Sequence, residues 1–252
     1  MSITLRELTK RFGGTTAVDG LNCQVEPGRV TGFLGPNGAG KSTTMRMILG
    51  LDRPTAGHAL VAGRPYADFR WPLREVGALL DAKAVHPGRS GRNHLLAMAH
   101  SNAIDARRVD EVLETVGLTE VARRRAGAYS LGMGQRLGIA GALLGDPAVL
   151  MFDEPVNGLD PDGVRWIRGL MRGLAAEGRT VFVSSHLMSE MQLTADHLIV
   201  VGRGRLIADA PIDEVIALGA AGPVTVRCPD PEQLAALGRR LAGESVTVRP
   251  DG

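Results

Sequence analysis

The nine residues from Gly35 to Thr43 constrain the fold of this chain more than any other segment. They read Gly-Pro-Asn-Gly-Ala-Gly-Lys-Ser-Thr and fit the pattern G-x-x-x-x-G-K-[ST] of a phosphate-binding loop. An apolar segment over 29–34 precedes the loop and predicts a buried strand, and residues 44–49 have the apolar spacing of a helix. A strand, a glycine-rich turn and a helix in this order predict an α/β domain that binds a nucleoside triphosphate.

Each part of this loop has an expected role at a bound triphosphate. Glycines let successive backbone N–H groups turn toward a phosphate, and the following helix adds its positive N-terminal end. Lys41 is expected to reach the β- and γ-phosphates, and the Ser42 hydroxyl to help hold Mg²⁺. A turn that binds nothing is the alternative, but it leaves the lysine–hydroxyl pair unexplained. The expected nucleotide contacts are Gly35, Asn37, Gly38, Ala39, Gly40, Lys41, Ser42 and Thr43.

A second run of residues predicts a pair of carboxylates at the same site. The apolar residues 149–152 are followed directly by Asp153 and Glu154. A buried strand would carry both side chains to the edge of a parallel sheet where ligands bind. Asp153 is a candidate Mg²⁺ ligand, and Glu154 is a candidate general base for the attacking water. The alternative is an acidic strand end that is merely solvated.

Two further residues gain interest from their places near strand and helix ends. His186 follows an expected strand over 180–184 and could touch the γ-phosphate, although a lone histidine is more often structural. Asp160 and Pro161 are typical of a turn into a helix, with Asp160 as its N-cap. This structural role for Asp160 can coexist with a functional one.

Strand and helix patterns alternate along most of the chain. Short, half-exposed strands are expected near 3–5 and 21–25, and helical patterns fill about 89–145. Ser90 or Asn93, and then Asp105, are candidate caps for helices in that block. Alternation resumes afterwards, which predicts a parallel sheet with helices on its faces and a helical block inserted into it. Further strands are expected near 59–61, 76–80, 148–152, 180–184 and 197–201, with helices over 164–176 and 187–193.

Composition excludes several classes of protein. The 252 residues are 44% hydrophobic and 22% charged, as in an ordinary globular domain, and a net charge of +2 is too small to predict a nucleic-acid surface. No apolar run approaches the ~20 residues of a membrane span, and the first residues do not read as a signal peptide. Cys23 and Cys228 lack the spacing of a metal or disulfide site. We therefore expect a cytoplasmic protein, and any membrane step requires another chain.

The segment from Tyr129 to Arg136 resembles the signature motif of ATP-binding cassette (ABC) ATPases. It reads Tyr-Ser-Leu-Gly-Met-Gly-Gln-Arg and lies between the phosphate loop and the carboxylate strand, as in that family. The resemblance covers about residues 1–218. It implies a P-loop NTPase fold with a RecA-like core, N-terminal antiparallel strands and a helical subdomain inserted at about 86–145. It also implies ATP and Mg²⁺ as ligands.

The same resemblance implies roles for residues outside the phosphate loop. Ser130 and Gly132 would form an anion site at a helix N-terminus, facing the γ-phosphate held by a second copy of the chain. An ordinary Ser-capped helix is the alternative. The remaining correspondences are Phe12 stacking on adenine with Val18 beside it, Asp160 in the loop that crosses the dimer interface, and His186 as the switch histidine.

Two departures from the family pattern stand out. Tyr129, Leu131 and Met133 replace three residues of the usual Leu-Ser-Gly-Gly-Gln signature. Asp81 stands where the family has a glutamine that senses Mg²⁺ or water and relays to a transmembrane partner. Asp81 could bind the metal more directly, or it could simply end a strand.

These variants resemble bacterial ABC-2-type exporters of the drug-resistance subgroup. That resemblance implies an ATPase subunit that works as a homodimer beneath a separate transmembrane permease. A soluble ABC regulator or assembly scaffold, and a nucleotide switch without a dimer, are the alternatives. A small βαβ-like extension is expected over 219–252, as part of an accessory domain.

Overall fold

A computed structural model describes residues 1–82 and 84–220 of the chain. Residues Met1 to Val215 form one compact unit, and a second unit begins at Ile216. The strands and helix expected over 224–248 lie outside the described residues. The strands are β1 (Ile3–Phe12), β2 (Thr15–Val25), β3 (Val30–Leu34), β4 (Ala56–Val61), β5 (Val76–Leu79), β6 (Val149–Asp153), β7 (Thr180–Ser185), β8 (His197–Gly202) and β9 (Arg205–Pro211). The helices are α1 (Lys41–Ile48), α2 (Gly91–Ser101), α3 (Arg107–Thr115), α4 (Leu131–Leu143), α5 (Pro161–Ala176), α6 (Met188–Gln192) and α7 (Ile212–Ala220).

A six-stranded sheet with the order β5-β6-β7-β3-β8-β9 forms the centre of the first unit. Neighbouring strands from β5 to β8 are parallel, as the alternation of elements predicts. Strand β9 runs antiparallel to β8 at the edge and was not predicted. Its residues are mostly exposed, so the sequence there lacks the buried apolar run that identifies the other strands. Strand β9 forms because it pairs with β8 in the folded protein, and a local sequence pattern does not show that pairing.

The expected N-terminal strands form a separate antiparallel sheet with the order β2-β1-β4. Ile3 and Leu5 of β1 are buried, and they belong to a core shared with α1 and one face of the large sheet. Phe33 of β3 and Phe182 of β7 meet in this core with ring centroids 5.1 Å apart. The apolar and polar residues of β1 alternate because successive side chains point to opposite faces and one face is buried.

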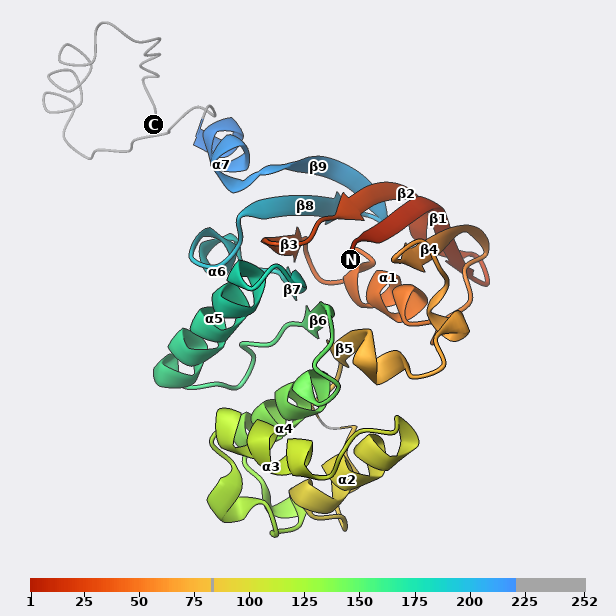
Figure 1. Ribbon diagram of the computed structural model, residues 1–252. Helices are drawn as coiled ribbons and strands as arrows, with labels where there is room; N and C mark the ends of the chain where they lie inside the picture. The colour runs from red at the N-terminus through yellow and green to blue at the C-terminus, as the bar shows by residue number, and fades with distance from the viewer. Residues whose placement is uncertain (83, 221–252) are drawn as a thin grey trace, which may run out of the picture. The chain divides into compact units, whose positions relative to one another are not determined.

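Helices α2, α3 and α4 form the helical block expected between β5 and β6 (Figure 1). Ser90 caps α2, since its Oγ accepts a hydrogen bond from the Asn93 N–H at 3.2 Å. The expected cap of α3 shifts by one residue: Ala106 is the N-cap, and Asp105 accepts from the Arg107 N–H at 2.8 Å. Within the described residues, no helix is long and apolar enough to cross a bilayer.

The helical block is joined to the large sheet through α4. A Cβ atom on Gly138 of α4 would collide with the side chain of Leu79 on β5, so the two elements approach closely. Leu79, Leu95 and Leu137 are buried in one continuous core that also includes α5 and α6. This packing fixes α4, and therefore its first residues, relative to the strand that ends in the two carboxylates.

Candidate functional site

The phosphate loop joins the end of β3 to the start of α1. Helix α1 begins at Lys41 rather than at 44, because Gly40 already serves as its N-cap in a left-handed conformation with φ of +98°. A Cβ on Gly40 would lie 2.5 Å from the carbonyl oxygen of Ala17, which only glycine avoids. Asn37 and Gly38 are exposed, so the tip of the loop is open to a ligand.

Lys41 is the buried cation of this loop. Its side chain is only 6% exposed, and its Nζ donates to the carbonyl oxygens of Gly35 at 2.6 Å and Pro36 at 3.3 Å. The same Nζ lies 3.6 Å from Oε1 of Glu154. The fold therefore brings the predicted phosphate-binding lysine and the predicted general base together.

The end of β6 and the end of β7 build the acidic side of the site. In the parallel register of these strands, Asp153 lies opposite Ser184. The Ser184 hydroxyl donates to Oδ1 of Asp153 and accepts from the backbone N–H of Glu154 at 2.9 Å. His186 follows β7, and its Nδ1 lies 2.9 Å from Oε2 of Glu154. The side chains of Glu154 and His186, both predicted to be catalytic, are therefore in direct contact next to Lys41.

Glu154 adopts a backbone conformation that non-glycine residues rarely use. Its φ angle is +49°, in the left-handed region. Such a conformation costs on the order of 1–3 kcal/mol and persists only where the surrounding structure holds it. Strain of this kind is concentrated at functional sites, which adds a structural observation to the sequence-based assignment of Glu154.

The expected metal ligands supply hydroxyl and carboxylate oxygens. Ser42 is exposed in the first turn of α1, Asp153 is half-buried at the end of β6, and Asp81 follows β5. Among the described residues, no group of three or more His, Cys, Asp or Glu side chains could hold a metal by itself. A small number of oxygen ligands from the protein is enough for Mg²⁺, because this ion keeps several waters and also binds substrate phosphates.

The two residues expected at the adenine differ in exposure. Phe12 ends β1 with 50% of its surface exposed, and the Lys10 ammonium lies 4.9 Å from the centroid of its ring. Val18 is 1% exposed and packs beside Gly40. The ring of Phe12 is therefore accessible for stacking, whereas Val18 is buried next to Gly40 of the phosphate loop.

The predicted anion site begins helix α4 in the helical block. Ser130 is its N-cap, with Oγ accepting from the Met133 N–H at 3.2 Å, and Gly132 lies in the first turn. Asp160 caps α5 in the same way, accepting from the Gly163 N–H at 2.8 Å, and Pro161 is the first helical residue as expected. The first N–H groups of any helix lack partners within the helix, which is the property that anion binding at a helix N-terminus uses.

Sequence reasoning missed two residues that hold the site together. Ser184 bridges Asp153 and Glu154, and its register opposite Asp153 could have identified it. Gln135 of α4 is buried and donates to the carbonyl oxygen of Pro155 at 2.8 Å. Gln135 lies inside the motif from Tyr129 to Arg136, so the sequence marks the residue, but its contact with Pro155 depends on how α4 packs.

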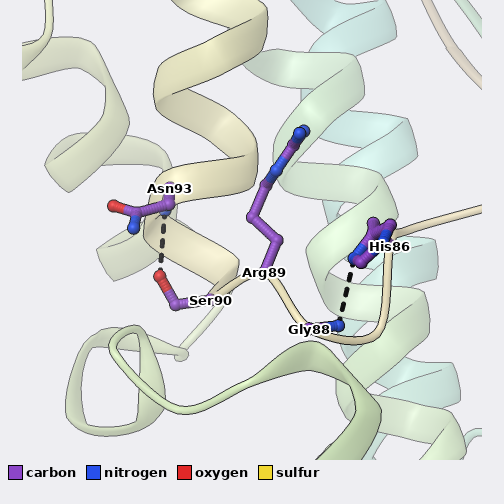
Figure 2. A pocket seen from close by; sticks show the side chains of 5 residues that line it. All are labelled: His86, Gly88, Arg89, Ser90 and Asn93. Atoms are coloured by element: carbon purple, nitrogen blue, oxygen red, sulfur yellow. Dashed lines mark hydrogen bonds between the residues drawn. The ribbon is translucent and has the colours of Figure 1, made fainter.

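A separate pocket of about 380 Å³ lies at the start of α2. Figure 2 shows His86, Gly88, Arg89, Ser90 and Asn93 around it. Two of its polar contacts are internal: the Gly88 N–H donates to His86 Nδ1 at 3.1 Å, and the Asn93 N–H donates to Ser90. The pocket shares no residue with the phosphate loop or with the carboxylate pair.

Comparison with known proteins assigns the chain to a family. The model of a family described as ABC transporter matches residues 18–157, more than half of the chain, including the phosphate loop and the carboxylate strand. The chain belongs to the ABC transporter family. The expected P-loop NTPase fold is confirmed, and the protein is an ATP-binding ABC ATPase.

Individual relatives support the same family. The bacitracin transport ATP-binding protein BcrA of Bacillus licheniformis is 42% identical over 216 residues, which is 84% of this ABC chain and 71% of BcrA. The daunorubicin resistance ATP-binding protein DrrA3 of Streptomyces coeruleorubidus is 36% identical over 255 residues, covering 99% of this chain and 81% of DrrA3. A solved dimeric ATP-binding cassette in a post-hydrolysis state with ADP and Pi has the same fold, with a TM-score of 0.76 at 23% identity over 83% of this chain and 98% of its own.

Proposed function

We propose that this chain is the ATP-hydrolysing subunit of an ABC exporter and works as a homodimer beneath a separate membrane permease. The observation that carries the proposal is the convergence of Lys41, Glu154 and His186 at one edge of the sheet. Nζ of Lys41 lies 3.6 Å from Glu154, and His186 Nδ1 lies 2.9 Å from the other carboxylate oxygen. Phosphoryl transfer needs mainly positioning and charge stabilisation, and this cluster supplies both.

Each residue of the cluster has a distinct part in hydrolysis. Lys41 stabilises negative charge on the β- and γ-phosphates. Glu154 accepts a proton from water while the water oxygen bonds to the γ-phosphorus and the bond to the β–γ bridging oxygen breaks. His186 holds the Glu154 carboxylate and contacts the γ-phosphate.

Ser42 and Asp153 are the residues that would hold Mg²⁺, and Asp81 is a further candidate ligand. Their oxygens are hard ligands, and the donor set leaves room for phosphate oxygens and water. When bound, the ion would neutralise negative charge that develops on the phosphates. Ser184 orients Asp153 for this role through its hydroxyl hydrogen bond.

We assign completion of the site to a second copy of the chain. Ser130 caps α4 and Gly132 lies in its first turn, at the positive end of the helix dipole. A γ-phosphate held by the partner's phosphate loop matches this anion site, and Asp160 lies in the segment that would cross the interface. The exposed ring of Phe12 would receive adenine.

The printed names of relatives support a role in transport. BcrA is named for bacitracin transport and DrrA3 for daunorubicin resistance. By this analogy the chain would energise export through a permease and lie at the inner face of the cell membrane. Binding of two ATP molecules would close the dimer, and hydrolysis would reopen it.

Glu154→Gln tests the catalytic part of this proposal. The variant should bind ATP, lose turnover by about 10²–10⁴-fold and accumulate ATP-dependent dimers in sedimentation velocity. Glu177→Gln, at the exposed end of α5, is the matched control and should behave as wild type. Wild-type turnover by Glu154→Gln would remove the base role.

The permease is tested separately, by purifying the tagged chain from solubilised membranes of its own cells. Recovery of a multi-span membrane protein supports the exporter. An interactome of soluble proteins alone would favour the regulator or scaffold instead.

A further inference from the structure

We propose that Gln135 of helix α4 is a positioning residue for Glu154, a role that rests on the function proposed for that carboxylate. Gln135 is 5% exposed, and its Nε2 donates to the carbonyl oxygen of Pro155 at 2.8 Å. Pro155 follows Glu154 directly and is itself buried. The amide therefore holds the backbone immediately beyond the general base.

The strained backbone conformation of Glu154 requires contacts that stabilise it. Its φ angle of +49° is one that side-chain-bearing residues rarely adopt, and it persists only when neighbouring structure fixes it. On the other side of the residue, the Glu154 N–H donates to Oγ of Ser184 at 2.9 Å. The peptide chain at Glu154 is thus fixed between β7, through Ser184, and α4, through Gln135.

The chemistry of Pro155 makes the amide contact specific. Proline has no backbone N–H, so its carbonyl oxygen is the polar group that this residue offers to a partner. A buried carbonyl that loses its hydrogen bond carries a desolvation penalty. Without Gln135, the Glu154 backbone would keep its hydrogen bonds to Ser184 and to the Asn157 N–H, but the Pro155 carbonyl would be unpaired. We expect the segment to shift toward water, which would move the carboxylate.

A second contact joins the same helix to the same loop. A Cβ atom on Gly158 would collide with the side chain of Leu131, the first residue of α4, so helix and loop are in direct contact there. The carbonyl oxygen of Gly158 would lie 3.4 Å from a Cβ on Gly132. The start of α4 and the loop that follows β6 are therefore in contact, and Gln135 adds a hydrogen bond between them next to the base.

Gln135→Met tests this role, because methionine has a similar length but no N–H donor. We expect unchanged ATP affinity and a kcat lowered by about 10- to 100-fold, as for a displaced reacting group. In a Glu154→Gln background the same substitution should cause no further loss of single-turnover rate, since it acts through Glu154. A merely structural effect would lower the rate equally in both backgrounds.

The matched control is Asn102→Leu. Asn102 is also a buried amide, 7% exposed, and it donates to the Met98 carbonyl at 3.2 Å, away from Glu154. It should lower thermal stability and leave kcat unchanged. If Gln135→Met does not fold, Gln135→Asn serves instead, because it keeps the amide but is too short to reach Pro155, and it should show the same loss of kcat.

Three results would overturn the proposal, and they differ in what else they overturn. Wild-type kcat in a folded Gln135→Met or Gln135→Asn protein, or an equal loss in both backgrounds, would remove the positioning role and leave the proposed function intact. Wild-type turnover by Glu154→Gln would remove the proposed function and the positioning role together.

Discussion

Nζ of Lys41 lies 3.6 Å from Oε1 of Glu154, so the phosphate-binding cation and the candidate base form an ion pair. Their side chains are 6% and 19% exposed, and water screens the pair only in part. A nucleotide γ-phosphate would compete with the Glu154 carboxylate for the lysine. Nucleotide binding is therefore expected to release the carboxylate for its role toward water.

Lys41→Ala should weaken ATP binding by about 10- to 100-fold, because it removes a charged hydrogen-bond donor to phosphate. Titration with a fluorescent ATP analogue measures this directly. Arg46→Ala is the control on the same helix, since Arg46 is exposed and pairs with Asp52 at 2.7 Å. An unchanged affinity in Lys41→Ala would contradict the assignment of Lys41.

Asp81→Gln should raise the Mg²⁺ concentration needed for half-maximal ATPase activity, because an amide oxygen is a weaker ligand than a carboxylate. The measurement is ATPase rate against Mg²⁺ at fixed ATP, together with transport in the presence of the permease. Asp110→Asn is the control, at an exposed carboxylate on α3 that pairs with Arg92. If both Mg²⁺ dependence and transport are unchanged in Asp81→Gln, the metal-sensing hypothesis is wrong.

Gly158→Ala should lower the free energy of unfolding by about 1–3 kcal/mol, because Gly158 has a φ of +76° and a Cβ would collide with Leu131. Adding Leu131→Ala should recover part of the loss, since it removes the collision but not the backbone strain. Urea unfolding measures both. Gly173→Ala in α5, where a Cβ meets no atom within 4 Å, should instead be neutral or stabilising by up to about 1 kcal/mol.

Cys23 predicts a pH dependence of stability at alkaline pH. Burial, aided by the negative charge of Asp209, raises the pKa of the Cys23 thiol to about 12. An unfolded thiol has a pKa of about 8.5, so between these values the folded state binds more protons and stability falls as the pH rises. Below the unfolded pKa the contribution is fully present.

Urea unfolding at several pH values above 8.5 checks the sign of this effect. The wild type should lose more free energy of unfolding with rising pH than Cys23→Ala does, because only the wild type must ionise this thiol on unfolding. Equal slopes for the two proteins would show that the Cys23 thiol is not protected by burial.

Much of the fold could be predicted because its signals are local. The parallel strands are continuous apolar runs, and the caps at Ser90, Ser130 and Asp160 are short polar signals that the structure places where they were expected. Strand β9 was missed, since its exposed residues carry no buried run. Helix α1 began earlier than expected, because a left-handed Gly40 starts the helix inside the motif itself.

The sequence by itself determined the chemical groups of this protein, because the phosphate loop and the Asp153–Glu154 pair are contiguous runs of residues. Only the tertiary structure decided how those groups meet. The ion pair between Lys41 and Glu154 and the hydrogen bond from Gln135 to Pro155 join segments that are distant in sequence. Such contacts arise from the packing of α4 and β7 around the end of β6, and no local pattern encodes them.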